Sequence, residues 1–203
     1  MPQSDRPPQI EFADWHAIAS DIAEQIDGAS PDQRPRIVGI SGSQGSGKST
    51  LANIVVEHIK QRGLQAVTVS LDDFYLTKAQ RIELSRTVHP LLRTRGVPGT
   101  HDSQWLGQVL HALQTANPAE GVTLELPTFD KGMDDRSGQR QVRCQILVLE
   151  GWCVGVQAQS DVSQPINALE RTADTEGRWR SWVNEQTREH YEPLWQCIDY
   201  WVQ

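Results

Sequence analysis

The feature that most constrains this chain of 203 residues is the glycine-rich segment Gly42-Ser43-Gln44-Gly45-Ser46-Gly47-Lys48-Ser49. It fits the pattern G-x-x-x-x-G-K-[ST], in which glycines let successive backbone N–H groups curl around the phosphates of a nucleotide. An expected buried strand at 36–41 precedes it and an expected helix at 49–62 follows it, so the positive end of that helix points at the phosphates. The sequence therefore predicts a phosphate-binding loop whose last contributing residue is Thr50.

Two side chains of this loop have distinct expected roles. Lys48 reaches the β- and γ-phosphates and takes up charge during transfer, and the Ser49 hydroxyl holds Mg²⁺. The expected cofactors are therefore ATP and Mg²⁺. The alternative, a merely flexible glycine turn, is disfavoured because the motif lies between a strand and a helix, as a phosphate loop must.

Strands and helices alternate along the rest of the chain. Apolar residues at three- and four-residue steps (Phe12, Trp15, Ile18, Ile22 and Ile26) predict a first helix after a loose tail at residues 1–10. Further strands are expected at 65–71, 122–126, 145–150 and 198–202, and further helices at 78–85, at 178–196 and after Ser103 as N-cap. This alternation predicts a three-layer α/β fold with a mostly parallel sheet flanked by helices. We expect residues 1–35 to be a tail and helix, and 36–203 to be one nucleotide-binding domain.

Composition and charge exclude several other classes of protein. Hydrophobic residues make up 37% of the chain and charged ones 22%, which is typical of a globular protein, and no apolar run approaches a membrane span. The first residues lack the basic start and apolar core of a signal peptide, so a cytoplasmic location is expected. Three cysteines without CxxC spacing predict free thiols. A net charge of -7 argues against general nucleic-acid binding, so the expected partner is a small molecule, with the oligomeric state left open.

Three carboxylates are expected at the C-terminal ends of strands. Asp72 and Asp73 follow the strand at 65–71, and Glu150 ends the strand at 145–150. In a parallel sheet these ends share one edge with the phosphate loop, where extra negative charge is useful if it holds Mg²⁺ or orients an attacking hydroxyl. Because adjacent strand residues point to opposite faces, the two aspartates are not expected to share a task. The alternatives are that both aspartates cap the next helix and that Glu150 is an ordinary strand-end charge.

Charged residues also gather in two expected loops, 93–102 and 128–138. They include Arg93, Arg95, His101, Asp102, Asp130, Lys131, Asp134, Asp135 and Arg136. Taken alone, such charges are usually solvated surface. The run Gly96-Val97-Pro98-Gly99-Thr100 adds tight turns, which suit a loop of fixed shape.

Several ordered motifs resemble the D-glycerate 3-kinase family, within the superfamily of phosphoribulokinase, uridine kinase and pantothenate kinase. The motifs are Ser70-Leu71-Asp72-Asp73-Phe74-Tyr75-Leu76-Thr77, Arg95-Gly96-Val97-Pro98-Gly99-Thr100-His101-Asp102, Pro127-Thr128-Phe129-Asp130-Lys131, Asp135-Arg136 and Leu149-Glu150-Gly151-Trp152-Cys153-Val154-Gly155. The segments 165–170 and 177–184 are similar to bacterial members. The resemblance covers roughly residues 36–203.

The resemblance implies an ATP-dependent kinase that phosphorylates a hydroxyl of a small metabolite, with D-glycerate to 3-phosphoglycerate as the leading reaction. It places the catalytic aspartate at Asp72 and puts Glu150 near Mg²⁺, together with Ser49 and Asp72. The implied acceptor contacts are Asp73, Tyr75, Arg95, His101, Asp130, Lys131 and Arg136. The carboxylate of glycerate needs a cation, and we expect Arg136 or Lys131, with Arg136 preferred because its planar fork binds a carboxylate bidentately.

Two other functions fit the same residues. One is a kinase of this superfamily with another acceptor, such as pantothenate or a nucleoside, for which Phe129 or Tyr75 would stack on the base. The other is a nucleotide-binding module without catalysis. Members of the resembling family continue past the strand at 198–202 into a lid-like, arginine-bearing helix, so this chain is expected to select weakly between purines and to couple transfer poorly.

Overall fold

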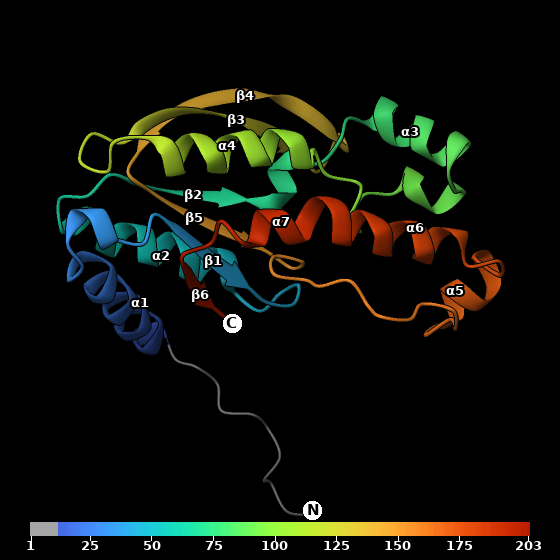
Figure 1. The fold of residues 1–203 in the computed structure, drawn as a ribbon, viewed down its shortest axis with the longest axis horizontal. Helices are drawn as coiled ribbons and strands as arrows, with labels where there is room; N and C mark the ends of the chain where they lie inside the picture. Colours follow the sequence, from blue (N-terminus) through green and yellow to red (C-terminus); the bar gives the residue numbers. More distant parts are fainter. Residues whose placement is uncertain (1–11) are drawn as a thin grey trace, which may run out of the picture.

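The computed structural model describes residues 12–203, and its centre is a parallel sheet (Figure 1). The described residues form a four-stranded sheet in the order β2-β5-β1-β6, in which every neighbouring pair is parallel. The strands are β1 (Ile37–Ser41), β2 (Ala66–Ser70), β5 (Ile146–Gly151) and β6 (Tyr200–Val202). The carboxyl ends of these strands therefore lie at one edge, which is where ligands bind in open α/β sheets.

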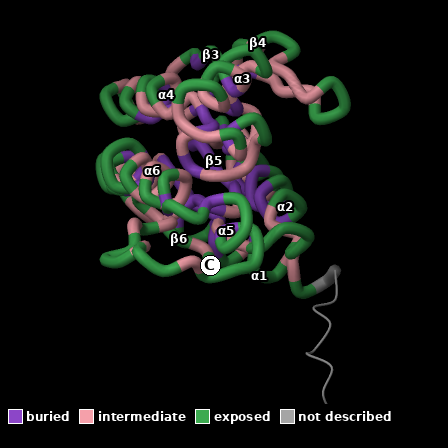
Figure 2. The backbone as a smooth tube through the Cα atoms, turned by 90° about the vertical axis from the view of Figure 1, so that its right-hand side faces the viewer, coloured by how far each residue is buried: buried purple, intermediate pink, exposed green. Residues whose placement is uncertain are grey.

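Two hydrophobic clusters, one on each face of the sheet, form the core. Helices α1 (Phe12–Asp27) and α2 (Lys48–Gln61) cover one face, while α4 (Ser103–Thr115) and α7 (Glu192–Trp195) cover the other with the hairpin of β3 (Val122–Asp130) and β4 (Asp135–Cys144). Strand β5 contributes side chains to both clusters, because successive residues of a strand point to opposite faces. Ile146 and Val148 belong to one cluster, and Leu147 and Leu149 belong to the other. Figure 2 shows the buried backbone concentrated around this strand. The predicted fold class is confirmed.

The remaining described elements are helices and short 3₁₀ turns. Helix α3 (Lys78–Thr87) begins at a capping box, in which Thr77 and Gln80 satisfy each other's backbone N–H groups. The segment predicted as one helix at 178–196 is α6 (Arg178–Gln186), a π-helical turn (Thr187–Tyr191) and α7 in direct succession (Figure 1). Helix α5 (Ala168–Ala173) and the 3₁₀ turns Pro31–Gln33, Leu71–Phe74 and Pro90–Arg93 complete the described elements.

Three details differ from the sequence-based expectations. The N-cap of α4 is Asp102, whose Oδ1 accepts a hydrogen bond from the Trp105 N–H at 3.1 Å, and Ser103 is already helical. Strand β3 extends to Asp130 and pairs with β4, so much of the expected loop at 128–138 is a hairpin held by backbone hydrogen bonds. The side chain of Ile18 is exposed, because the buried stripe of α1 runs instead through Ala19, Ile22, Ala23 and Ile26.

The tail at residues 1–10 lies outside the described residues, and so does the side chain of Phe12. Cys144, Cys153 and Cys197 are free thiols. Within 12–203, no helix combines the length and the apolar character needed to cross a membrane.

Candidate phosphate and acceptor site

The glycine-rich segment forms a tight loop between β1 and α2. Gly45 and Gly47 have φ angles of 78° and 86°, in the left-handed region that favours glycine, and Gly47 is the N-cap of α2. The Ser46 N–H donates to the Ser43 carbonyl at 3.2 Å, and the Lys48 ammonium donates to the same carbonyl at 3.3 Å. The backbone is thus wound around a small concavity, with the lysine side chain folded along it.

A pocket of about 280 Å³ opens at this loop, on the carboxyl edge of the sheet. Its lining residues come from four separate segments of the chain: Gln44, Gly45, Lys48, Ser49, Asp72, Lys131, Glu150, Gly151 and Trp152. The fold therefore brings the phosphate loop together with two of the carboxylates predicted at strand ends. It also adds one cation from the tip of the β3–β4 hairpin.

Asp72 and Asp73 lie in the 3₁₀ turn that follows β2, and their surroundings differ. The Asp72 carboxylate lines the pocket and accepts a hydrogen bond from the Lys131 ammonium at 2.7 Å. Burial raises the pKa of Asp73, and the charge of Arg140 partly opposes that rise. Neither aspartate is the N-cap of α3, because Thr77 fills that position. The division of tasks between the two aspartates stays a prediction, but helix capping does not account for them.

Glu150 is the penultimate residue of β5 and is only 4% exposed. Its Oε2 is buried and has no hydrogen-bond partner among the described residues. A buried carboxylate oxygen without a partner is costly unless a cation or a donor reaches it. Since Ser49 and Asp72 line the same pocket, this oxygen-rich set fits the ligand chemistry of Mg²⁺.

Tyr75 and His101 lie behind Asp72 in the interior. Their rings stack with centroids 4.3 Å apart, and burial together with the nearby Asp72 charge raises the pKa of Tyr75. The Tyr191 hydroxyl accepts a hydrogen bond from the Gly99 N–H at 2.8 Å and forms a second hydrogen bond with His101 Nδ1, also at 2.8 Å. Burial lowers the pKa of His101 to about 3, so this histidine is neutral at ordinary pH. It fixes the loop at 95–102 and does not line the pocket.

The other residues expected to contact the acceptor are engaged within the protein. Arg136 donates to the Tyr75 carbonyl at 3.1 Å and to Asp102 at 3.3 Å, with its guanidinium 5.0 Å from the Trp105 ring. Arg95 pairs with Asp134 and lies over the Phe129 ring, and Asp130 accepts from two N–H groups in the hairpin turn. None of the three lines the pocket. Of the residues expected to contact the acceptor, Lys131 is the cation that does line it.

Sequence reasoning missed Arg81, which is fully buried on α3. Its guanidinium donates to the carbonyls of Leu76, Arg93 and Asp134, and it forms a 3.0 Å ion pair with the Asp134 carboxylate. It thereby joins the loop at 93–102 to the hairpin tip that carries Lys131. The sequence offers one weak signal, the scarcity of apolar residues in α3, but the structure alone shows that Arg81 is the one buried residue of this fully described helix.

We expect Arg81→Met to lower the free energy of unfolding by about 3 kcal/mol, because it leaves buried carbonyls and a carboxylate without their cation. The matched control is Arg86→Met on the same helix, where the arginine is exposed and its ion pair with Glu83 spans 3.8 Å. That change should cost less than about 1 kcal/mol. Urea unfolding of both variants measures the difference, and equal midpoints would contradict the bracing role of Arg81.

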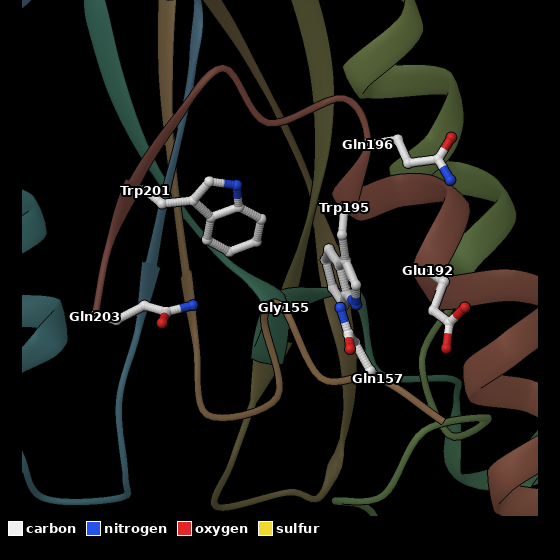
Figure 3. A pocket seen from close by; sticks show the side chains of 7 residues that line it. All are labelled: Gly155, Gln157, Glu192, Trp195, Gln196, Trp201 and Gln203. Atoms are coloured by element: carbon white, nitrogen blue, oxygen red, sulfur yellow. The ribbon is translucent and has the colours of Figure 1, made fainter. Parts of the chain in front are cut away.

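A larger pocket, of about 420 Å³, lies beside the end of β6. Figure 3 shows Trp195 and Trp201 on opposite sides of it, with Gly155 between them. Its other lining residues are Gln157, Glu192, Gln196 and Gln203. The described lining contains no cation and no residue of the phosphate loop, so this pocket is not suited to phosphates despite its size.

Comparison with known proteins finds that this chain is similar to P-loop proteins, several of which are named as kinases. Residues 15–184 match the model of the KAP family P-loop domain. The uncharacterized kinase mug58 of Schizosaccharomyces pombe is 36% identical over 186 residues, which are 85% of this chain and 65% of that protein. The chloroplastic D-glycerate 3-kinase of Arabidopsis thaliana is 29% identical over 184 residues, which are 84% of this chain and 38% of that protein. The chain thus spans less than two thirds of either relative.

Among solved structures, the D-glycerate 3-kinase from Cryptococcus neoformans has the same fold, with a TM-score of 0.71 and 28% identity. The match covers 93% of this chain and 72% of that one. The resemblance noted from the sequence motifs is therefore confirmed at the level of the P-loop kinase superfamily.

Proposed function

Since the chain belongs to the KAP family of P-loop domains, we propose that it is an ATP-dependent kinase that phosphorylates a hydroxyl of a small metabolite. One observation carries the proposal: a single pocket joins the phosphate loop, the unpartnered carboxylate of Glu150 and the carboxylate of Asp72. Binding of nucleotide phosphates, charge neutralisation and orientation of a hydroxyl are the three tasks of phosphoryl transfer, and each has its residue here.

In this proposal the backbone of residues 42–49 and the Lys48 ammonium bind the β- and γ-phosphates. Ser49, Glu150 and Asp72 would hold Mg²⁺, which neutralises charge that develops on the transferred group. Asp72 orients the acceptor hydroxyl and accepts its proton. Lys131, which lies 2.7 Å from Asp72, keeps that carboxylate in place on the acceptor side of the pocket. Positioning and electrostatics supply most of the acceleration in such transfers.

We propose D-glycerate as the acceptor, and Lys131 as the cation for its carboxylate. Support comes from the names of the Arabidopsis and Cryptococcus relatives and from the charges at the pocket. Among the described lining residues the cations are Lys48 and Lys131, and the first belongs to the phosphates. The Lys131 side chain is 64% exposed, so it can reach a ligand while it pairs with Asp72, whereas Arg136 is 18% exposed and held by Tyr75 and Asp102 outside the pocket. We therefore assign the contact with the glycerate carboxylate to Lys131, and not to Arg136 as the sequence suggested.

The experiment that tests this function measures ADP and phosphorylated product with Mg·ATP and a panel of acceptors. D-glycerate, uridine and pantothenate are each supplied alone, with a control that lacks any acceptor. We expect ADP formation that rises when glycerate is supplied and is accompanied by phosphoglycerate. Phosphorylation of uridine or pantothenate but not glycerate would overturn the acceptor and keep the kinase. Nucleotide binding without transfer to any of them would instead favour a module without catalysis.

Changing Lys131 to Met should raise the KM for glycerate about 10- to 100-fold, because a hydrogen bond to a charged group is worth about 1.5–3 kcal/mol. The KM for ATP should stay within about twofold, since Lys48 still binds the phosphates. Lys60→Met, at an exposed position of α2 outside this pocket, is the control. Steady-state kinetics with each substrate varied separately gives the answer. An equal rise in both KM values would argue against a carboxylate contact.

A further inference from the structure

The first turn of α1 lies against the phosphate loop. A Cβ atom placed on Gly47 would be only 2.4 Å from Cη2 of Trp15 and 3.0 Å from its Cζ2. The edge of the indole is therefore packed directly on the Cα atom of Gly47. This glycine has a left-handed φ of 86°, caps α2 and immediately precedes Lys48.

The position of Trp15 is fixed by the way α1 docks on α2. One residue along, His16 Nδ1 lies 3.2 Å from His58 Nε2 on α2, and the Tyr200 hydroxyl of β6 donates to Gln25 at 2.9 Å. The half-buried indole packs against the hydrophobic cluster that both helices share. The members of that cluster from α1 are Ala19, Ile22, Ala23 and Ile26. The helix thus holds the indole against Gly47, and Trp15 itself is not among the residues that line the pocket.

We propose that Trp15 is a positioning residue of the phosphate site. Backbone N–H groups bind a phosphate well only when they already converge on it, and glycines such as Gly45 and Gly47 have the most conformations to lose on ordering. An indole packed on Gly47 removes part of that freedom before the nucleotide arrives. It also keeps water from one side of the loop, and low local polarity strengthens the N–H contacts to phosphate.

In this role α1 contributes to nucleotide binding, although the sequence pattern separates residues 1–35 from the nucleotide-binding domain at 36–203. The match to the P-loop family model likewise begins at residue 15. The inference rests on the proposed nucleotide binding at residues 42–49 and is independent of the acceptor. It therefore concerns nucleotide affinity and not the choice of substrate.

The test compares Mg·ADP binding by Trp15→Ala, Trp15→Phe and Ile22→Ala, each measured by calorimetry on the full chain. Ile22 belongs to the same buried face of α1 but lines neither the loop nor the pocket, so its change loosens the helix alone. We expect Trp15→Ala to weaken binding about tenfold, the effect of about 1.4 kcal/mol. Trp15→Phe keeps an aromatic ring on Gly47 and should stay within about threefold, and Ile22→Ala within about twofold.

A second measurement detects the contact directly. The indole N–H signal of Trp15, identified by its loss in Trp15→Phe, should shift as Mg·ADP is added, with the same Kd as in calorimetry. An unmoved signal, unchanged affinity in Trp15→Ala, or an equal loss in Ile22→Ala would each overturn the positioning role. If the wild type binds no Mg·ADP at all, the proposed function falls together with this inference. Normal wild-type binding with any of the other three results refutes this inference alone.

Discussion

The Asp72→Asn variant is expected to turn over at least about a hundredfold more slowly than the wild type, with little change in nucleotide affinity because Ser49 and Glu150 remain in the pocket to hold Mg²⁺. A positioned proton acceptor typically contributes 10²- to 10⁴-fold to such reactions. Asparagine keeps the size of the side chain, so the loss reports the missing negative charge. The measurement is kcat with saturating ATP and glycerate, together with Mg·ADP binding by calorimetry.

Asp73→Asn is the matched control, because it removes the same charge from the next residue of the same 3₁₀ turn. Asp73 does not line the pocket, and burial raises the pKa of its carboxyl group. We expect its kcat to fall by less than about tenfold. A larger loss in Asp73→Asn than in Asp72→Asn would show that the neighbouring carboxylate is the one that handles the acceptor proton.

Lys48→Ala should fold normally and bind Mg·ADP at least about a hundredfold more weakly. Lys48 lines the pocket, and its ammonium donates a hydrogen bond to the Ser43 carbonyl within the same loop, so we expect its removal to leave the fold intact. In ADP the Lys48 ammonium contacts the β-phosphate, through charge-assisted hydrogen bonds of about 1.5–3 kcal/mol each. Losing two such bonds is sufficient for the expected drop in affinity.

The control for Lys48→Ala is Lys60→Ala, near the opposite end of α2, which removes an equal charge far from the loop. Urea unfolding checks that both variants are folded, and calorimetry compares their affinity for Mg·ADP. Wild-type affinity in a folded Lys48→Ala variant would contradict the assignment of residues 42–49 to the phosphates. That result would remove the premise on which the proposed function and the role of Trp15 both rest.

The sequence alone determined the loop, the sheet and the place of the key carboxylates. The G-x-x-x-x-G-K-[ST] pattern is local, because its geometry depends on glycine conformations and on the helix that follows. The continuous apolar run of β5 predicts a strand covered on both faces, which requires helices on each side. Once the strands are parallel, the ends that carry Asp72 and Glu150 must share an edge with the loop.

Tertiary structure decided which charged residues face the pocket. Arg95, His101 and Arg136 belong to motifs that resemble an acceptor site, yet each is held by a partner from another segment, such as Asp134, Tyr191 or Asp102. Lys131 is left facing Asp72 because the β3–β4 hairpin extends to Asp130, further than its polar sequence indicated. These ion pairs and side-chain hydrogen bonds join residues far apart in the chain, and spacing along the sequence carries no information about such contacts.

The same reason explains why Arg81 and Trp15 were found only in the folded chain. Arg81 occupies the buried side of a polar helix, where three carbonyls and a carboxylate from distant segments replace an apolar core. In the sequence pattern, Trp15 is one of the apolar positions of an amphipathic helix, with nothing to distinguish it from the others. Only the docking of α1 on α2 brings its indole onto Gly47. The local sequence pattern determines whether a segment forms a helix, a strand or a loop, whereas the packing of these segments determines which side chains are in contact.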